Sequence, residues 1–128
     1  MPTLVRPTSE RLSNKRAGCE FEGAFGVGQC DLAFDIGGMG ARGVNFHYEV
    51  FARMGFEEEC ARIQDLYLAG SRPEAIAAVP LAMVEKIALV GPKAKITDEL
   101  PMWENSMIAT MMIGGSPDTL RTMAELVG

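Results

Sequence analysis

The sequence predicts an α/β fold that is rich in helices and holds two or three short parallel strands. From Ile87 onward, apolar runs of strand length alternate with segments of helical periodicity. Such alternation, with short connections, is typical of parallel strands joined by right-handed crossovers. Before Ile87, apolar residues recur at helical spacing, which predicts several amphipathic helices.

The first 31 residues differ in composition from the rest of the chain. Residues 1–31 contain prolines, scattered basic residues and several glycines, with no sustained period of strand or helix. We therefore expect 1–31 to be an irregular or poorly ordered N-terminal segment and 32–128 to be the folded domain. At its start, Leu32–Ile36 is a short apolar run ended by Gly37 and Gly38, which predicts a brief buried strand.

Two amphipathic helices are expected next. Val44, Tyr48 and Phe51 lie at i, i+4 and i+7, and the same spacing returns after Gly55, which we expect to be the joint. The second helix should end at Gly70, since glycine commonly follows a helix C-terminus. Its apolar residues are Phe56, Cys60, Ile63 and Tyr67.

A proline-containing start signal predicts another helix from Ser71. Ser71–Glu74 has the capping-box pattern, with a proline in the first turn, and opens an alanine-rich helix that should run to about Val79. Pro80 should close it, and a short helical turn should follow. The continuous apolar run Ile87–Val90, stopped by glycine and proline, then predicts a buried parallel strand.

The last part of the chain reads as helix, strand and helix. Ile96, Leu100 and Trp103 share one helical face, although Pro101 should kink this helix. Met107–Ile113 is a second apolar run, and glycines break it before a helix that starts at Pro117. We expect this last helix to bury Leu120, Met123, Ala124 and Val127.

Charge and length exclude several classes of partner. The 128 residues suit one domain, and a net charge of -5 has the wrong sign for binding nucleic acid. Neither a membrane-spanning run nor the apolar stretch of a signal peptide is present, so we expect a cytoplasmic protein without a membrane partner.

Few residues could bind a metal or act as catalytic groups. Cys19, Cys30 and Cys60 are odd in number and widely spaced, which predicts free thiols. His47 is the single histidine, and no second ligand accompanies it by spacing. We therefore predict no metal site, and no catalytic acid, base or nucleophile can be named.

Three glycine-containing segments are candidates for ligand binding. Gly38–Gly43 matches GxGxxG, but the following residues read as helix, so the glycines more simply permit a tight turn or a close backbone approach. A small Rossmann-like nucleotide binder is kept as an alternative. Gly91-Pro92-Lys93 and Gly114-Gly115-Ser116 both fall at strand-to-helix junctions, where backbone N–H groups favour anions. Lys93 and Lys95 are expected to be solvated surface charges.

Several motifs together resemble one known family. They are Ile36–Gly43, Asn45-Phe46, Phe51–Phe56, Ile63–Gly70, Ala77–Pro80 and Leu89–Pro92. In combination they are similar to the C-terminal portion of luciferase-like, deazaflavin-dependent oxidoreductases. The resemblance covers residues 32–128, about three-quarters of the chain.

The resemblance implies that residues 32–128 are the C-terminal fragment of a (β/α)₈ barrel. Leu89–Pro92 would be its seventh strand and Ile108–Gly115 its eighth. The family binds coenzyme F-420, or FMN in flavin-using relatives, and transfers a hydride between the coenzyme and a small organic substrate. The residues expected beside the coenzyme are Gly37, Gly38, Met39, Gly40, Gly91, Gly114, Gly115 and Ser116.

Most groups that line the family's coenzyme pocket come from earlier parts of the barrel. The chain is therefore expected to lack a complete site and to need the missing N-terminal barrel half, supplied by a partner. The alternative is a non-catalytic remnant or a small α/β module whose exposed apolar faces drive homo-oligomer formation.

Overall fold

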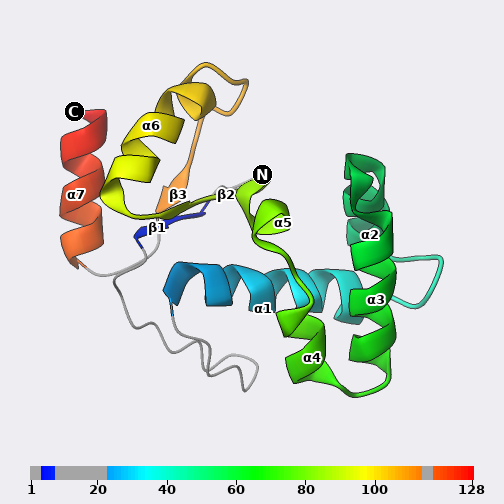
Figure 1. The fold of residues 1–128 in the computed structure, drawn as a ribbon. Coiled ribbons are helices and arrows are strands. Elements are labelled where there is room, and N and C mark those ends of the chain that lie inside the picture. Colours follow the sequence, from blue (N-terminus) through cyan, green and yellow to red (C-terminus); the bar gives the residue numbers. More distant parts are fainter. Residues whose placement is uncertain (1–3, 8–22, 114–116) are drawn as a thin grey trace.

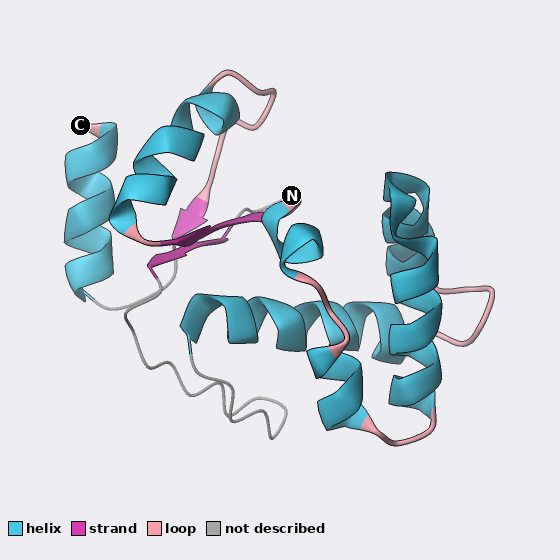
Figure 2. Ribbon diagram, in the orientation of Figure 1, coloured by secondary structure: helices cyan, strands magenta, loops and turns pink. Residues whose placement is uncertain are grey.

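The computed structural model describes residues 4–7, 23–113 and 117–128. In these ranges, short parallel strands lie between two groups of helices (Figure 1). The elements, in chain order, are β1 (Leu4–Pro7), α1 (Gly23–Gly38), α2 (Phe46–Phe51), a π-helical turn (Ala52–Phe56), α3 (Glu57–Leu68), α4 (Arg72–Ala77), α5 (Leu81–Glu85), β2 (Ala88–Gly91), α6 (Lys93–Glu104), β3 (Met112–Ile113) and α7 (Pro117–Val127). The structure thus has the predicted helix-rich α/β character (Figure 2).

The three strands form an open parallel sheet in the order β2-β1-β3. Leu4 pairs with Ala88 on one side and with Met112 on the other, so β1 lies between the two strands of the C-terminal half. In a (β/α)₈ barrel, consecutive strands are direct neighbours. Parallel strands are therefore present at the two apolar runs predicted from Ile87 onward, whereas the described residues form no closed barrel.

The N-terminal region contains regular structure where none was expected. Leu4–Pro7 is a strand, and α1 begins at Gly23 and runs across the compositional boundary between residues 31 and 32. The predicted strand at Leu32–Ile36 is wrong, because these residues belong to α1. A short apolar run does not distinguish a strand from a buried helix, and the helical period of the buried positions becomes clear only when Val27 and Cys30 are included.

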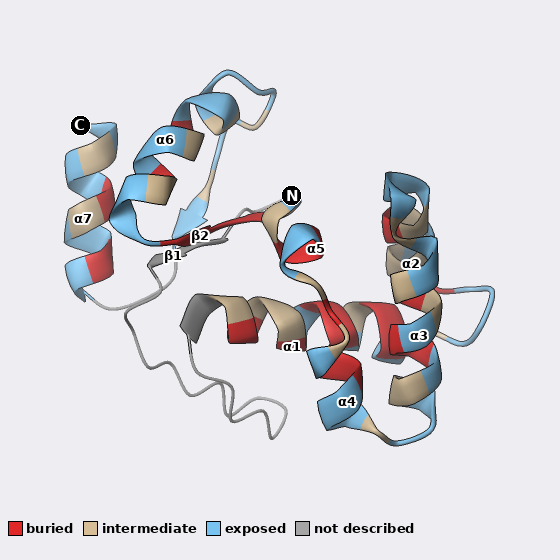
Figure 3. Ribbon diagram, viewed as in Figure 1, coloured by how far each residue is buried: buried red, intermediate tan, exposed pale blue. Residues whose placement is uncertain are grey.

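The larger hydrophobic core surrounds α1 (Figure 3). Leu32, Ala33 and Ile36 are fully buried and pack with residues of α3, α4 and α5. Two glycines bring neighbouring helices close. A Cβ atom at Gly28 would lie 2.7 Å from Val84 of α5, and one at Gly37 would lie 2.4 Å from the Cβ of Tyr67 on α3.

The strand β2 separates this core from a smaller one. Ala88 and Val90 belong to the core around α1, whereas Leu89 packs with α6 and α7. This division follows from the strand's geometry, since successive side chains point to opposite faces of a sheet. A continuous apolar run was predicted to be a strand buried on both faces, and β2 confirms this: all four residues are buried. The smaller core consists of Leu89, Ile96, Leu100 and Met123.

The α2–α3 hairpin follows the prediction, except at its start. Gly55 and Gly70 have φ angles of 98° and 84°, so both adopt the left-handed backbone expected at a helix joint and a helix stop. Val44 lies before α2 and is 75% exposed, so it does not belong to the buried face as predicted.

In α3, burial raises the pKa of the Cys60 thiol to about 11, which makes this cysteine an inert core residue.

The helices α4 and α6 and the strand β3 also differ from the predictions in detail. Ser71 is the N-cap residue of α4, but its side chain makes no capping hydrogen bond. The helix α6 continues through Pro101 to Glu104, and β3 is much shorter than the apolar run that predicted it.

The last helix is rotated relative to the prediction. Thr119 and Met123 are buried, with Leu126 partly buried, whereas Leu120 and Val127 are 50% and 61% exposed. Ala124 is exposed too. Met123 lies on both the predicted apolar face, with Leu120 and Val127, and the observed one, with Leu126. Packing in the core shared with α6 buries the second face and leaves the first in solvent.

The contact between Gly37 and Tyr67 leads to a stability prediction. Gly37→Ala should lower the free energy of unfolding by about 1–3 kcal/mol, because the added methyl group forces α1 and α3 apart. In a Tyr67→Gly background, which removes that Cβ, the same substitution should cost nothing or stabilise by up to about 1 kcal/mol, since alanine favours the helix. Urea denaturation of the four proteins measures this cycle, and equal effects of Gly37→Ala in both backgrounds would contradict it.

Candidate functional site

The carboxyl ends of the three parallel strands meet at one edge of the sheet. Pro7 of β1 is paired with Gly91 of β2, and Val5 is paired with Ile113 of β3. In open α/β sheets, ligands bind outside this edge. Gly91 therefore lies where the sequence prediction placed it. The predicted residues Gly114, Gly115 and Ser116 follow β3 directly in the sequence, but they lie outside the described residues.

Gly91 has a backbone conformation that requires glycine. Its φ angle is 145°, and a Cβ atom there would lie 2.8 Å from the Cδ of Lys95. The Lys95 side chain thus covers the exit of β2, and its Nζ forms an ion pair with Glu85 of α5 and lies 3.9 Å from Glu99. The prediction that Lys95 is a solvated surface charge holds only in part, since its side chain is 30% exposed and is paired with Glu85.

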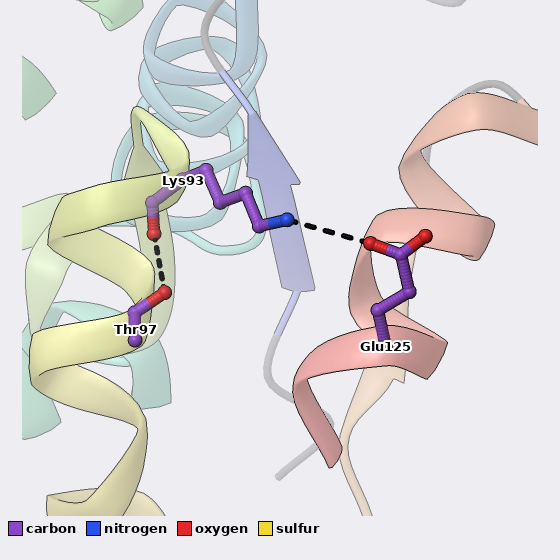
Figure 4. A network of polar contacts seen from close by, with 3 residues as sticks. All are labelled: Lys93, Thr97 and Glu125. Atoms are coloured by element: carbon purple, nitrogen blue, oxygen red, sulfur yellow. Dashed lines mark hydrogen bonds and ion pairs between the residues drawn. The ribbon is translucent and has the colours of Figure 1, made fainter. Parts of the chain in front are cut away.

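Lys93, at the first position of α6, is more exposed. Its Nζ lies 3.4 Å from an Oε2 of Glu125 on α7, with the two side chains 56% and 70% exposed (Figure 4). Such a pair contributes about 0–1 kcal/mol. The backbone carbonyl of Lys93 accepts a hydrogen bond of 2.8 Å from the Thr97 hydroxyl. An anion that binds the Lys93 ammonium group would replace its weak ion pair with Glu125.

The start of α6 can bind an anion through its backbone. Ile96 donates the first helical hydrogen bond, to the carbonyl of Pro92 at 3.1 Å. The N–H groups of the three preceding residues have no partner within the helix, as is general for a first turn. With the helix dipole, these donors suit a phosphate group. The edge therefore has backbone donors of the kind that bind phosphate groups.

The other predicted residues lie at the far end of α1. Gly37 and Gly38 are its last residues, and Met39 and Gly40 follow in the turn. In Figure 1, this end of α1 lies against α3, while the opposite end lies near the sheet. The structure therefore does not bring Gly37–Gly40 together with Gly91.

The glycines of the GxGxxG match have packing roles. A Cβ atom at Gly38 would lie 2.9 Å from the Tyr67 ring, and one at Gly40 would lie 3.2 Å from the carbonyl oxygen of Val44. Gly43 has a positive φ angle of 78°. The close approaches and the tight turn expected from these glycines are present, and the approaching groups belong to the protein itself.

The sequence analysis missed the role of Asn45, which joins α1 to α2. Asn45 is 2% exposed. Its side-chain amide donates hydrogen bonds to the carbonyl oxygens of Asp35 at 2.9 Å and Ile36 at 2.8 Å, and its Oδ1 accepts one from the N–H of Tyr48 at 3.1 Å. One side chain thus caps the end of one helix and the start of the next. The available signal was an asparagine directly before a helical stripe, the preferred N-cap type.

Asp35 is a half-buried carboxyl group close to the same junction. Burial raises the pKa of Asp35 above its usual value of 3.8, and the charge of His47 acts in the opposite direction. A raised carboxyl pKa means that the folded state favours the protonated form. Among the described residues, no three histidine, cysteine or acidic side chains gather in a group that could bind a metal.

Comparison with known proteins gives one relative. The chain is 32% identical over 97 residues to a Mycobacterium tuberculosis protein named "Putative coenzyme F420-dependent oxidoreductase". The match covers 75% of this chain and 28% of that protein, so the chain spans little more than a quarter of the relative's length. No family model and no solved structure matches the chain.

In the described part of the chain, no helix has the length and apolar character needed to cross a membrane.

The double cap of Asn45 leads to a second prediction. Asn45→Asp keeps an oxygen for the Tyr48 N–H but loses both donors, whereas Asn45→Ala loses all three hydrogen bonds. Because buried carbonyls lose their partners, each variant should be destabilised by about 1–3 kcal/mol, with Asp at least as harmful as Ala near neutral pH. Thermal unfolding measures the effect. A change below about 0.5 kcal/mol for both variants would show that the caps are dispensable.

The raised pKa of Asp35 predicts how stability depends on pH. The contribution of the protonated carboxyl is fully present below pH 3.8 and is lost as the pH rises through the higher pKa of the folded state. Asp35→Asn, which keeps the shape without the charge, should therefore be more stable than the wild type at pH 7. The difference should shrink towards pH 3.5. Chemical denaturation at both pH values checks this, and a difference that grows on acidification would contradict it.

Proposed function

We propose that this chain is part of a luciferase-like, coenzyme F-420-dependent oxidoreductase that acts in the cytoplasm on a small organic substrate. The observation that carries the proposal is the 32% identity over 97 residues to a protein named for this activity. The parallel strands with a glycine at the exit of β2 support it, because such edges bind phosphate-bearing coenzymes.

In the proposal, the coenzyme's phosphate lies at the carboxyl edge of the sheet. Lys95 passes close to Gly91 and pairs with Glu85, which holds the start of α6 against α5. The first turn of α6 offers its backbone N–H groups to the phosphate. Gly91 is the described residue that we assign to the coenzyme, together with Gly114, Gly115 and Ser116, which follow β3 in the sequence. When bound, the coenzyme would supply the hydride chemistry. FMN is the alternative coenzyme.

The proposal requires more than the residues 1–128. The match covers 28% of the relative, so further parts of a barrel would be needed to enclose the coenzyme. In that barrel, β2 and β3 would be the seventh and eighth strands and would pair directly. Since β1 now lies between them, forming the barrel would require β1 to leave this position.

A second candidate function is a non-catalytic α/β module. The open sheet and the large apolar side chains exposed in the described residues favour this alternative, since such surfaces promote association rather than catalysis. The two candidates differ in one measurable property, which is saturable binding of the coenzyme.

Fluorescence titration with coenzyme F-420, and separately with FMN, distinguishes the two functions. The oxidoreductase proposal predicts saturable micromolar binding of F-420 by non-aggregated protein, verified by light scattering. Lys93→Gln should weaken binding several-fold, because it removes a positive charge beside the phosphate position. Lys86→Gln is the matched control, since Lys86 precedes β2 and lies at the opposite edge of the sheet. Absence of binding by folded protein would favour the non-catalytic module.

A further inference from the structure

The strand β1 occupies the centre of the sheet, between the two strands of the C-terminal half. Leu4 pairs with Ala88 of β2 on one side and with Met112 of β3 on the other, and Val5 is likewise paired on both sides. Neighbouring strands lie about 4.8 Å apart, so the Cα atoms of Ala88 and Met112 are separated by about twice that distance. β1 therefore holds β2 and β3 apart.

β1 also lies outside the part of the chain that carries the family resemblance. The resemblance covers residues 32–128, whereas β1 is Leu4–Pro7. In the proposed barrel, β2 and β3 would be the seventh and eighth strands, and consecutive barrel strands pair directly. The structure thus places a strand from outside the resembling region where these two strands would meet.

The strands differ in how firmly side-chain packing holds them. β2 is fixed on both faces, since Ala88 and Val90 belong to the larger core and Leu89 belongs to the smaller one. In β3, Met112 and Ile113 are 54% and 38% exposed, so neither side chain is locked in a core. When β1 leaves, β2 keeps its place, and β3 is the strand that can move across to it.

β1 is a short strand with an incomplete set of hydrogen-bond donors. It comprises four residues, and its last residue, Pro7, has no backbone N–H to contribute to the pairing with Gly91. Direct pairing of β3 with β2 would replace part of the hydrogen bonds that β2 loses when β1 leaves. Exchange of one parallel strand for another therefore costs fewer hydrogen bonds than opening the sheet.

We propose that β1 is an autoinhibitory strand that holds the sheet open. While β1 lies between β2 and β3, these two strands cannot pair with one another, and the barrel arrangement is blocked. Release of β1 lets β3 take its place against β2, with Met112 opposite Ala88. The inhibitory role rests on the proposed oxidoreductase function, whereas the strand exchange itself is measurable without a coenzyme.

A pair of introduced cysteines reports the exchange. Ala88→Cys and Met112→Cys place two thiols in one row of the sheet and on the same face, because both residues pair with Leu4. A disulfide requires Cα atoms within about 7 Å of each other, which is less than the separation across β1 and more than the spacing of directly paired strands. Under a mild oxidant, the disulfide should thus form only in molecules that have released β1. Peptide mapping by mass spectrometry distinguishes it from links to the natural cysteines.

Proline substitutions in β1 should speed the formation of this disulfide. In a strand that is paired on both sides, the N–H groups of successive residues point to opposite neighbours, so Val5→Pro and Arg6→Pro each remove a donor to a different strand. Each should raise the rate of disulfide formation at least about tenfold, because proline is not tolerated in a central strand. Val5→Gly keeps the donor but weakens the strand, and it should raise the rate several-fold. Val5→Ile is the matched control, since it keeps both the N–H and a β-branched side chain, and it should leave the rate unchanged.

Hydrogen exchange in α1 and α6 checks that both cores stay folded in each variant. Rapid disulfide formation with unsubstituted β1, or unchanged rates in the proline and glycine variants, would overturn the proposal. A rate in Val5→Ile as high as in Val5→Pro would also overturn it, since strand pairing would then not control the exchange.

The result is separable from that of the F-420 titration. Binding of F-420 without strand exchange would overturn the role of β1 alone. Strand exchange without F-420 binding would overturn the oxidoreductase proposal, and with it the inhibitory role, but not the exchange of β1 for β3.

Discussion

The fold depends on how closely α1 approaches the helices around it. At Gly37, the Cβ of Tyr67 occupies the space that any other side chain would fill, so α1 and α3 pack at a separation that only glycine allows. Asn45 then ties the end of α1 to the start of α2 through buried hydrogen bonds. Together, these contacts orient the helical hairpin, and with it the whole larger core.

The strand β2 connects this helical part to the edge where ligands would bind. Its alternating side chains join two cores, so Gly91 is placed by packing on both faces of the sheet. Lys95 passes over Gly91 and reaches Glu85, which links α6 to α5 across the strand end. The absence of a side chain at Gly91 is thus needed for the close passage of Lys95.

The candidate site separates into parts that sequence reasoning could and could not predict. The position of Gly91 at the end of a strand was predicted because a glycine after a buried apolar run marks a strand exit, whatever the rest of the fold. Gly37 and Gly38 were also predicted to mark the end of a strand, yet they end the helix α1 and lie against Tyr67. A glycine required by a neighbouring side chain cannot be distinguished from one required by a ligand until the neighbour is known. Asn45 was missed for a similar reason, because two of its three hydrogen bonds go to another helix.

By itself, the sequence determined the local elements: the α2–α3 hairpin with its glycine joint, the buried strand β2 and the alternating order that follows it. These depend on periodicity and on backbone preferences, which act between near neighbours. Only the tertiary structure decided that 32–36 is helical, that β1 lies between β2 and β3, and which stripe of α7 is buried. Each of these outcomes depends on long-range packing, where several local solutions have similar energies and contacts between distant residues select one.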